Sequence, residues 1–229
     1  MNRENKYSIE KDRLIIALTG SVGSGCSWLA NDFLGKEENF RVFSVRKEIL
    51  EVEAQNAGID LTKVKKNKRK KLQDIGNKLR KWDIENGNSG GILIRRAIGI
   101  LEREKCKKPI VIYSIKNPLE VEELKRYSNA YLIAMDTSLP IRWERIKEKQ
   151  YNNDYAQFLR DDDRDKDEGL KIKDKDRGIC YYGQQVQKCV DLADIVIDND
   201  VDFNDSEDKK DKLKNKIKQH LVLCPAKCA

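Results

Sequence analysis

A glycine-rich segment near the start of the chain combines residue types that could bind phosphate. It follows a short apolar run and precedes a segment with helical spacing. Glycines let the backbone curl so that successive N–H groups point at phosphate oxygens, and the following helix adds its positive amino-terminal end. The spacing G-x4-G-x-S predicts a site for ATP or another (deoxy)nucleoside triphosphate, and a plain strand-to-helix turn is the alternative. The predicted binding residues are Gly20, Ser21, Val22, Gly23, Ser24, Gly25, Cys26 and Ser27.

Three side chains decide what this loop could do with a bound nucleotide. Ser27 places a hydroxyl where Mg²⁺ would be coordinated. Cys26 stands where such loops carry a lysine, and a thiol that is neutral near pH 7 cannot offset the charge that grows in phosphoryl transfer. Asp136, which closes the apolar run Ala130–Met135, is the predicted acid of the Mg²⁺ site, or else an N-cap. We therefore expect binding through the backbone to survive, while catalysis would need another cation.

Five short apolar runs alternate with segments of helical spacing. None of the runs alternates polar and apolar residues, which is typical of strands covered on both faces. This order predicts an α/β fold, a three-layer P-loop NTPase of the nucleotide-kinase type with a mostly parallel five-stranded sheet. We expect one domain over residues 1–204 and a charged closing helix and tail over 205–229. The predicted strands are Leu14–Leu18, Arg41–Ser44, Ile110–Tyr113, Ala130–Met135 and Ile195–Ile197, and the predicted helices cover 28–34, 45–57, 72–84, 92–104, 121–127, 141–151, 182–192 and 205–222.

Composition and charge indicate the class of protein and its compartment. The 229 residues carry a net charge of +7, and 37% of them are charged. No stretch approaches about 18 consecutive apolar residues, so no membrane span is predicted. The start has no apolar signal region and the six cysteines are scattered, which predicts a reduced, cytoplasmic protein. Lys63–Lys71 holds seven bases in nine residues. That run is either a solvated loop and helix start or, since no aromatic residue interleaves it, a weak contact for RNA phosphates.

Several stretches together resemble P-loop nucleotide kinases of the dephospho-CoA kinase and deoxynucleoside-monophosphate kinase type. They are most similar to the kinase-like amino-terminal half of bacterial anti-phage deoxycytidylate deaminases. The chain has no His-x-Glu sequence, so the deamination step of such proteins is not carried by these residues. The matching stretches are LTGSVGSGCS at 18–27, RKKLQDIGNKLR at 69–80, SIKNPLEVEEL at 114–124, LIAMDTSLPIRWERI at 132–146, DDDRD at 161–165 and YGQQVQKCVDLADIVIDND at 182–200.

The resemblance implies roles for further residues. Arg142 and Arg145, one helical turn apart, are expected to clamp transferring phosphates, although surface ion pairing is the alternative. Arg160 and Arg164 flank an acidic loop that is expected to act as a lid. Lys116 follows a predicted strand at the sheet edge where ligands bind. An acceptor or cofactor face is expected on one side of a helix, with an ordinary wet face as the equal alternative; its residues are Arg69, Gln73, Asn77 and Arg80.

These observations leave three functions open. The leading hypothesis is a nucleotide-binding regulatory module of the deaminase type that controls a deaminase domain or another partner, with little or no phosphotransfer. The second is an active nucleoside monophosphate or dephospho-CoA kinase in which Arg142, Arg145 or Lys116 supplies the missing charge. The third is an RNA- or protein-binding adaptor with a relic loop. Homo-oligomer formation is compatible with each. His220, Cys224 and Cys228 have a spacing that suggests zinc, but a fourth ligand is missing.

Overall fold

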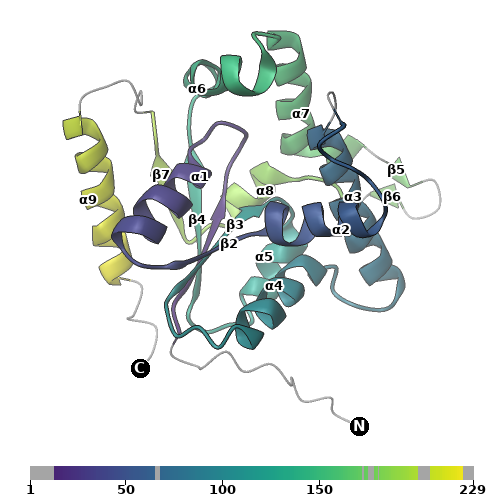
Figure 1. The fold of residues 1–229 in the computed structure, drawn as a ribbon, viewed down its shortest axis with the longest axis horizontal. Coiled ribbons are helices and arrows are strands. Elements are labelled where there is room, and N and C mark those ends of the chain that lie inside the picture. The colour runs from purple at the N-terminus through teal and green to yellow at the C-terminus, as the bar shows by residue number, and fades with distance from the viewer. Residues whose placement is uncertain are drawn as a thin grey trace.

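A five-stranded parallel sheet forms the centre of the molecule (Figure 1). The computed structural model describes residues 13–64, 68–171, 173–174, 178–179, 181–200 and 207–223. Strand order is β2-β3-β1-β4-β7, and every neighbouring pair is parallel. The strands are β1 (Ile15–Thr19), β2 (Arg41–Ser44), β3 (Ile110–Ile115), β4 (Ala130–Asp136) and β7 (Ile195–Asp198).

Helices cover both faces of this sheet, which is why its strands are apolar throughout. One face packs against η1 and α9, through Phe33 and Ile217 among others. The opposite face packs against η2, α4, α5 and α8 in a second apolar cluster. In Figure 1 the first layer lies left of the sheet and the second lies right of it. The covering elements are α1 (Cys26–Trp28), η1 (Leu29–Glu37), η2 (Val45–Leu50), α4 (Ile92–Arg103), α5 (Pro118–Leu124), α8 (Val186–Asp191) and α9 (Glu207–Leu223). Two further helices, α2 (Glu51–Asn56) and α3 (Lys68–Glu85), pack against η2, and α3 also packs against α4.

A lobe of two helices rises above the carboxyl edge of the sheet (Figure 1). It consists of α6 (Leu139–Tyr151) and α7 (Tyr155–Lys171). Its small core joins Ile146, Tyr151 and Phe158 to Val22, which belongs to the loop after β1. The lobe is therefore attached directly to the predicted phosphate loop. A short antiparallel pair, β5 (Lys173–Asp174) and β6 (Gly178–Ile179), follows it.

The predicted fold class and all five strands are confirmed. The expected acidic loop between Arg160 and Arg164 is wrong, because these residues lie inside helix α7. Its charged side chains are paired within the helix, as in Arg164–Glu168, and across to neighbouring helices, as in Arg142–Asp162. Such pairing stabilises the helix, and Phe158 anchors it in the core of the lobe.

Within the part of the chain that the structure describes, no helix is long and apolar enough to cross a membrane.

The closing helix α9 supplies apolar side chains to the same core as β1 and η1. Ile217 is fully buried there. Replacing it with alanine removes buried methyl groups and leaves a cavity, so Ile217→Ala should lower the free energy of unfolding by about 2–5 kcal/mol. Urea denaturation measures the change. Lys216→Ala, at an exposed position of the same helix, should stay within about 0.5 kcal/mol of the parent. Equal stability of the two variants would contradict the packing of α9 on the sheet.

Candidate nucleotide-binding site

The loop between β1 and α1 has a backbone that requires glycine at Gly20, where a Cβ would lie 2.6 Å from Met135 O, and at two further points. Gly23 and Gly25 have φ angles of 83° and 103°, in the left-handed region where other residues are strained. A Cβ on Gly23 would also lie 2.8 Å from the carbonyl oxygen of Arg142. Ser24 N–H donates to the carbonyl of Ser21 at 3.1 Å and tightens the turn. The glycines predicted from the sequence to shape a phosphate loop therefore do shape a tight turn at the carboxyl end of β1.

Side chains from distant elements hold the carbonyl oxygens of this loop. Arg142 donates to Val22 O at 3.1 Å and Arg145 donates to Gly23 O at 3.2 Å. Asn199 and Thr137 donate to Ser24 O at 2.8 and 3.1 Å. In a planar trans peptide the next N–H points opposite to the carbonyl. These contacts thus turn the N–H groups of Gly23 and Gly25, which follow Val22 and Ser24, away from the donors, as anion binding requires. The N–H that follows Gly23 is that of Ser24 and is already bonded to Ser21 O.

The thiol of Cys26 is turned beneath the loop. Its Sγ lies 3.2 Å from the carbonyl oxygen of Thr19 and 3.4 Å from Ser24 Oγ. Burial raises the pKa of this thiol, and the nearby charge of Lys116 offsets only part of that effect. Cys26 is accordingly a neutral donor to the end of β1, not a group directed at a phosphate.

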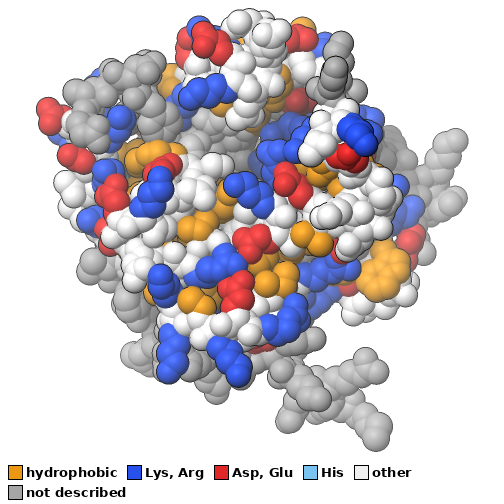
Figure 2. Space-filling view, in the orientation of Figure 1, with side chains coloured by type: hydrophobic (Ala, Val, Ile, Leu, Met, Phe, Trp, Pro, Cys, Tyr) orange, Lys and Arg blue, Asp and Glu red, His pale blue; other side chains and the backbone are white. Residues whose placement is uncertain are grey.

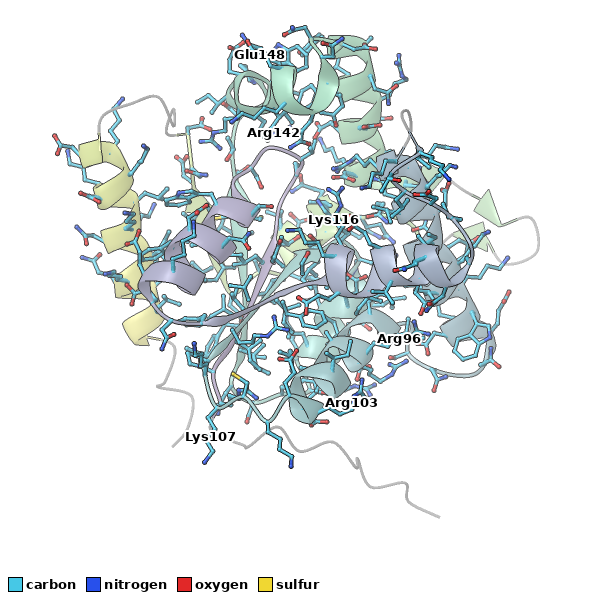
Figure 3. All side chains as sticks on the ribbon, viewed as in Figure 1. Arg96, Arg103, Lys107, Lys116, Arg142 and Glu148 are labelled. Atoms are coloured by element: carbon cyan, nitrogen blue, oxygen red, sulfur yellow. The ribbon has the colours of Figure 1, made fainter. Side chains whose placement is uncertain are left out.

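A lysine from the neighbouring strand reaches the loop instead. Lys116 Nζ donates to the carbonyl oxygen of Gly20 at 2.7 Å and to Asp165 Oδ2 at 3.1 Å. An irregularity at the end of β3 brings it there: Ser114 has φ 77°, and the pairing register shifts so that Thr19 lies opposite Ile115. One extra residue in a strand re-aims the side chains that follow it. Figure 3 shows Lys116 below Arg142, beside the loop that leads from β1 to α1.

A cavity of about 590 Å³ opens beside the loop, between η2, α3, the end of β3 and the α6–α7 lobe. Figure 2 shows this face hollowed below the lobe, with Lys and Arg side chains along the hollow. Seven cations and two acids line it. This excess of positive charge favours an anionic ligand with several charges. The cations are Arg46, Lys47, Arg69, Arg80, Lys116, Arg145 and Lys149, and the acids are Glu120 and Asp165.

The inner wall of the cavity is the predicted polar face of α3. Arg69, Gln73 and Arg80 line it. Arg80 and Glu120 are almost completely buried, and Arg80 Nε lies 3.3 Å from Glu120 Oε1. The fourth predicted residue, Asn77, is absent from the lining and instead donates to Glu168. The structure thus brings three members of this face to one cavity with the loop.

Three further predicted residues lie outside the cavity lining. Arg142 is buried behind the loop, where its guanidinium donates to Thr137 O and Val22 O and pairs with Asp162. Arg164 pairs with Asp74 and with Glu168. Asp136 is exposed at the end of β4. Their roles toward a nucleotide or a metal ion stay predictions.

The donor set for a metal ion at this loop is small. Ser27 is exposed at the start of α1 and lines the cavity. Among the described residues, no group of three or more His, Cys, Asp or Glu side chains is arranged to hold a metal ion. Ser27 is thus the protein oxygen that fits Mg²⁺ beside the loop, and phosphate and water would have to supply the other ligands. Cys224 and Cys228 of the suggested zinc site lie outside the described residues.

Sequence reasoning missed several residues of the cavity. Arg46 and Lys47 follow β2 directly, so the rule that ligands bind at the carboxyl ends of parallel strands could have identified them. Glu120 and Asp165 gave no such signal, because only the fold shows that they are buried. The residues of the basic run Lys63–Lys71 do not form one surface. Arg69 lines the cavity, whereas Lys63 is exposed and pairs with Asp60. Residues 65–67 lie outside the described residues.

No protein-family model matches the chain. UPF0200 protein PH1008 of Pyrococcus horikoshii is 29% identical over 210 residues, which cover 89% of this chain and 97% of the relative. UPF0200 protein MJ1399 of Methanocaldococcus jannaschii is 25% identical over 208 residues, 91% and 92% of the two chains.

Solved structures are similar in fold at low sequence identity. TT1252 from Thermus thermophilus has a TM-score of 0.51 and 16% identity, with 92% of this chain and 97% of that chain covered. An uncharacterised protein from Eubacterium ventriosum has a TM-score of 0.50 and 19% identity, with 92% and 99% covered. A candidate kinase from Chloroflexus aurantiacus has a TM-score of 0.50 and 16% identity, with 93% and 98% covered. The chain therefore has the same fold as these three proteins.

The raised pKa of Cys26 predicts how its thiol reacts. Alkylation requires the thiolate, so the rate of labelling by iodoacetamide should still be rising above about pH 9, where an ordinary cysteine is already half ionised. Peptide mapping by mass spectrometry across about pH 7 to 10 measures the rate at Cys26 alone. A glutathione control at the same pH values removes the effect of the reagent. A rate at Cys26 that levels off near neutral pH would contradict the buried, neutral thiol.

Proposed function

We propose that this chain binds a nucleoside triphosphate with its phosphates on the loop of residues 20–27, and that it holds the nucleotide as a regulatory ligand with little or no phosphotransfer. One observation carries the proposal: the loop carbonyls are tied back by Arg142, Arg145 and Asn199, while Cys26 is turned beneath the loop. The first of these two features supports an anion site at the loop. The second removes the charge that catalysis at such a loop uses.

The charge of the cavity supports binding of a polyphosphate. A lining of seven cations and two acids is unfavourable on its own, because like charges in a partly enclosed space repel each other. A ligand with several negative charges relieves that repulsion. ATP and the deoxynucleoside triphosphates fit this requirement better than a neutral metabolite does.

The same contacts support slow turnover. The charge of Lys116 acts on the Cys26 thiol, and the same ammonium is paired with the buried carboxylate of Asp165. Arg142 and Arg145 are both bonded to backbone carbonyls of the loop. Developing charge on a transferring phosphoryl group would have to compete with these partners. Within the described residues, the only acids of the lining are the ion-paired Glu120 and Asp165.

The sequence resemblance supports a more specific role. The stretches that resemble anti-phage deoxycytidylate deaminases run from the loop through β7. We accordingly propose a module whose nucleotide-bound state controls a deaminase domain or a partner protein that carries the zinc chemistry. Mg²⁺ would accompany the nucleotide through Ser27, supplying charge neutralisation at the phosphates.

An active kinase is the second candidate, and one observation favours it. A single cavity joins the loop to Arg69, Gln73 and Arg80. An acceptor such as a nucleoside monophosphate or dephospho-CoA placed on those residues would face the phosphates on the loop. Lys116 and Arg145, which line the same cavity, would then supply the charge that Cys26 lacks.

Nucleotide binding is tested by thermal unfolding with ATP, GTP, dCTP and dTTP, each with and without Mg²⁺. A ligand at about 100 times its Kd stabilises the native state by about 2.7 kcal/mol. In a chain of this size that raises Tm by about 5–10 °C. The same protein should transfer phosphate to nucleoside monophosphates at well under about 1 per second, the lower end for working kinases. No shift with any triphosphate would refute the binding site, and fast transfer would establish the kinase.

A lysine at position 26 tests why turnover is slow. Cys26 itself lines the cavity. The longer side chain of Cys26→Lys can therefore extend into the cavity, beside the phosphates. If the lost charge limits transfer, this variant should show at least a tenfold gain in phosphotransfer, about 1.4 kcal/mol of the barrier.

The matched control is Cys106→Lys, at the opposite edge of the sheet between α4 and β3, which should gain nothing. If Cys26→Lys bound nucleotide normally but remained inactive, the missing lysine would not be the cause of slow turnover.

A further inference from the structure

Asp165 differs from the other acids of α7 in being completely buried. Its carboxylate accepts hydrogen bonds from Arg69, from Gln73 Nε2 at 2.6 Å and from Lys116 Nζ at 3.1 Å. Burial alone would raise the pKa of this group, but the charges of Arg69 and Lys116 outweigh burial and lower it. Asp165 is thus an ionised carboxylate enclosed by donors from two different elements, α3 and the end of β3.

Lys116 lies between this carboxylate and the phosphate loop. Its ammonium donates to Gly20 O at 2.7 Å and to Asp165 at 3.1 Å. A lysine ammonium has three N–H donors, so these acceptors use two of them. Because Lys116 also lines the cavity beside Ser21 and Gly23, the remaining donor is available to a ligand on the loop. A flexible lysine side chain becomes a defined phosphate contact when two acceptors fix its position.

We propose that Asp165 is a positioning residue: it fixes the ammonium of Lys116 beside the phosphate loop, where this ammonium contacts the bound phosphates in place of the lysine that Cys26 replaces. The inference rests on the proposed binding of a nucleoside triphosphate. It adds a role for α7, because the helix that carries Asp165 must be docked on α3 for Lys116 to be held. The contacts of Asp165 with Arg69 and Gln73 contribute to that docking, together with Arg164–Asp74 and Asn77–Glu168.

If Asp165 positions Lys116, removing its charge should weaken the binding of a polyphosphate. If Asp165 only neutralises the cavity, removing its charge should strengthen that binding. If Asp165 only neutralised the cavity, then Asp165→Asn would leave Lys116 and Arg69 with more net charge, and a polyphosphate would bind more tightly. If Asp165 positions Lys116, the amide holds the ammonium less firmly and the polyphosphate binds more weakly. The sign of the change therefore separates the two roles without any assumption about activity.

The test uses isothermal titration of the full chain with inorganic tripolyphosphate and with the triphosphate that gives the largest thermal shift. We expect Asp165→Asn to weaken the binding of both by about tenfold, the lower range for a hydrogen bond to a charged group. Binding of the corresponding nucleoside should not change. Asp163→Asn is the matched control, since it removes the same charge from an exposed position of the same helix, and it should leave each Kd within about twofold.

Lys116→Met supplies the second arm and keeps the inference testable if Asp165→Asn fails to fold. Lys116 is partly exposed, with 21% of its side-chain surface accessible, so its loss should be tolerated better than that of a buried acid. We expect the same tenfold weakening, and the double variant should bind no more weakly than Lys116→Met alone, because both changes remove one interaction.

Three results would overturn the inference: tighter binding by Asp165→Asn, unchanged binding by Lys116→Met, or losses that add in the double variant. A parent protein that binds neither tripolyphosphate nor any triphosphate would instead overturn the proposed function itself. The two failures are thus distinguishable in one set of titrations.

Discussion

Each peptide group carries a donor and an acceptor that point in opposite directions, and this constraint governs the whole site. A loop can present N–H groups to an anion only where its carbonyl oxygens find donors on the other side. In this protein those donors come from Arg142, Arg145 and Asn199, up to 175 residues away in the sequence. Helix α6 and the segment after β7 are therefore part of the phosphate loop in physical terms. The small apolar cluster of Val22 with Phe158 joins the same parts.

This constraint also explains the positions of the two arginines that were expected to face phosphate: Arg145 lines the cavity and Arg142 does not. The guanidinium of Arg142 donates to Val22 O and Thr137 O and pairs with Asp162, so it binds the loop backbone and α7 instead of facing the cavity. Arg145 donates to Gly23 O and also lines the cavity. Both arginines therefore support the loop through its carbonyl oxygens. Most of the positive charge that faces a ligand in the cavity comes from η2, from α3 and from Lys116 after β3.

The parts of the fold that follow from local pattern were predictable from the sequence, and the parts that depend on distant partners were not. The strands and the glycine loop are local: apolar runs end at breakers, and φ above zero at Gly23 and Gly25 needs glycine. The polar face of α3 followed from helical spacing, and three of its four residues line the cavity. Helix α7 was missed, because the ion pairs that stabilise it, such as Arg69–Asp165, join residues far apart in the chain.

The burial of Asp165 could not be predicted from the sequence alone, but it follows once the helix around it is known. In the run DDDRD the acids look equivalent, yet Asp163 is exposed and Asp165 is completely buried. Once the part of α7 before Asp167 is known to be helical, Asp162 and Asp165 fall three apart on one face, and both are buried. Glu168 is buried as well, but it follows the non-helical backbone of Asp167 (φ −149°). A helix that turns acids inward needs cations beside them, which here are Arg142 for Asp162, and Arg69 and Lys116 for Asp165. The acidic helix and the basic cavity thus require each other, and neither could be assigned from the sequence until the other was placed.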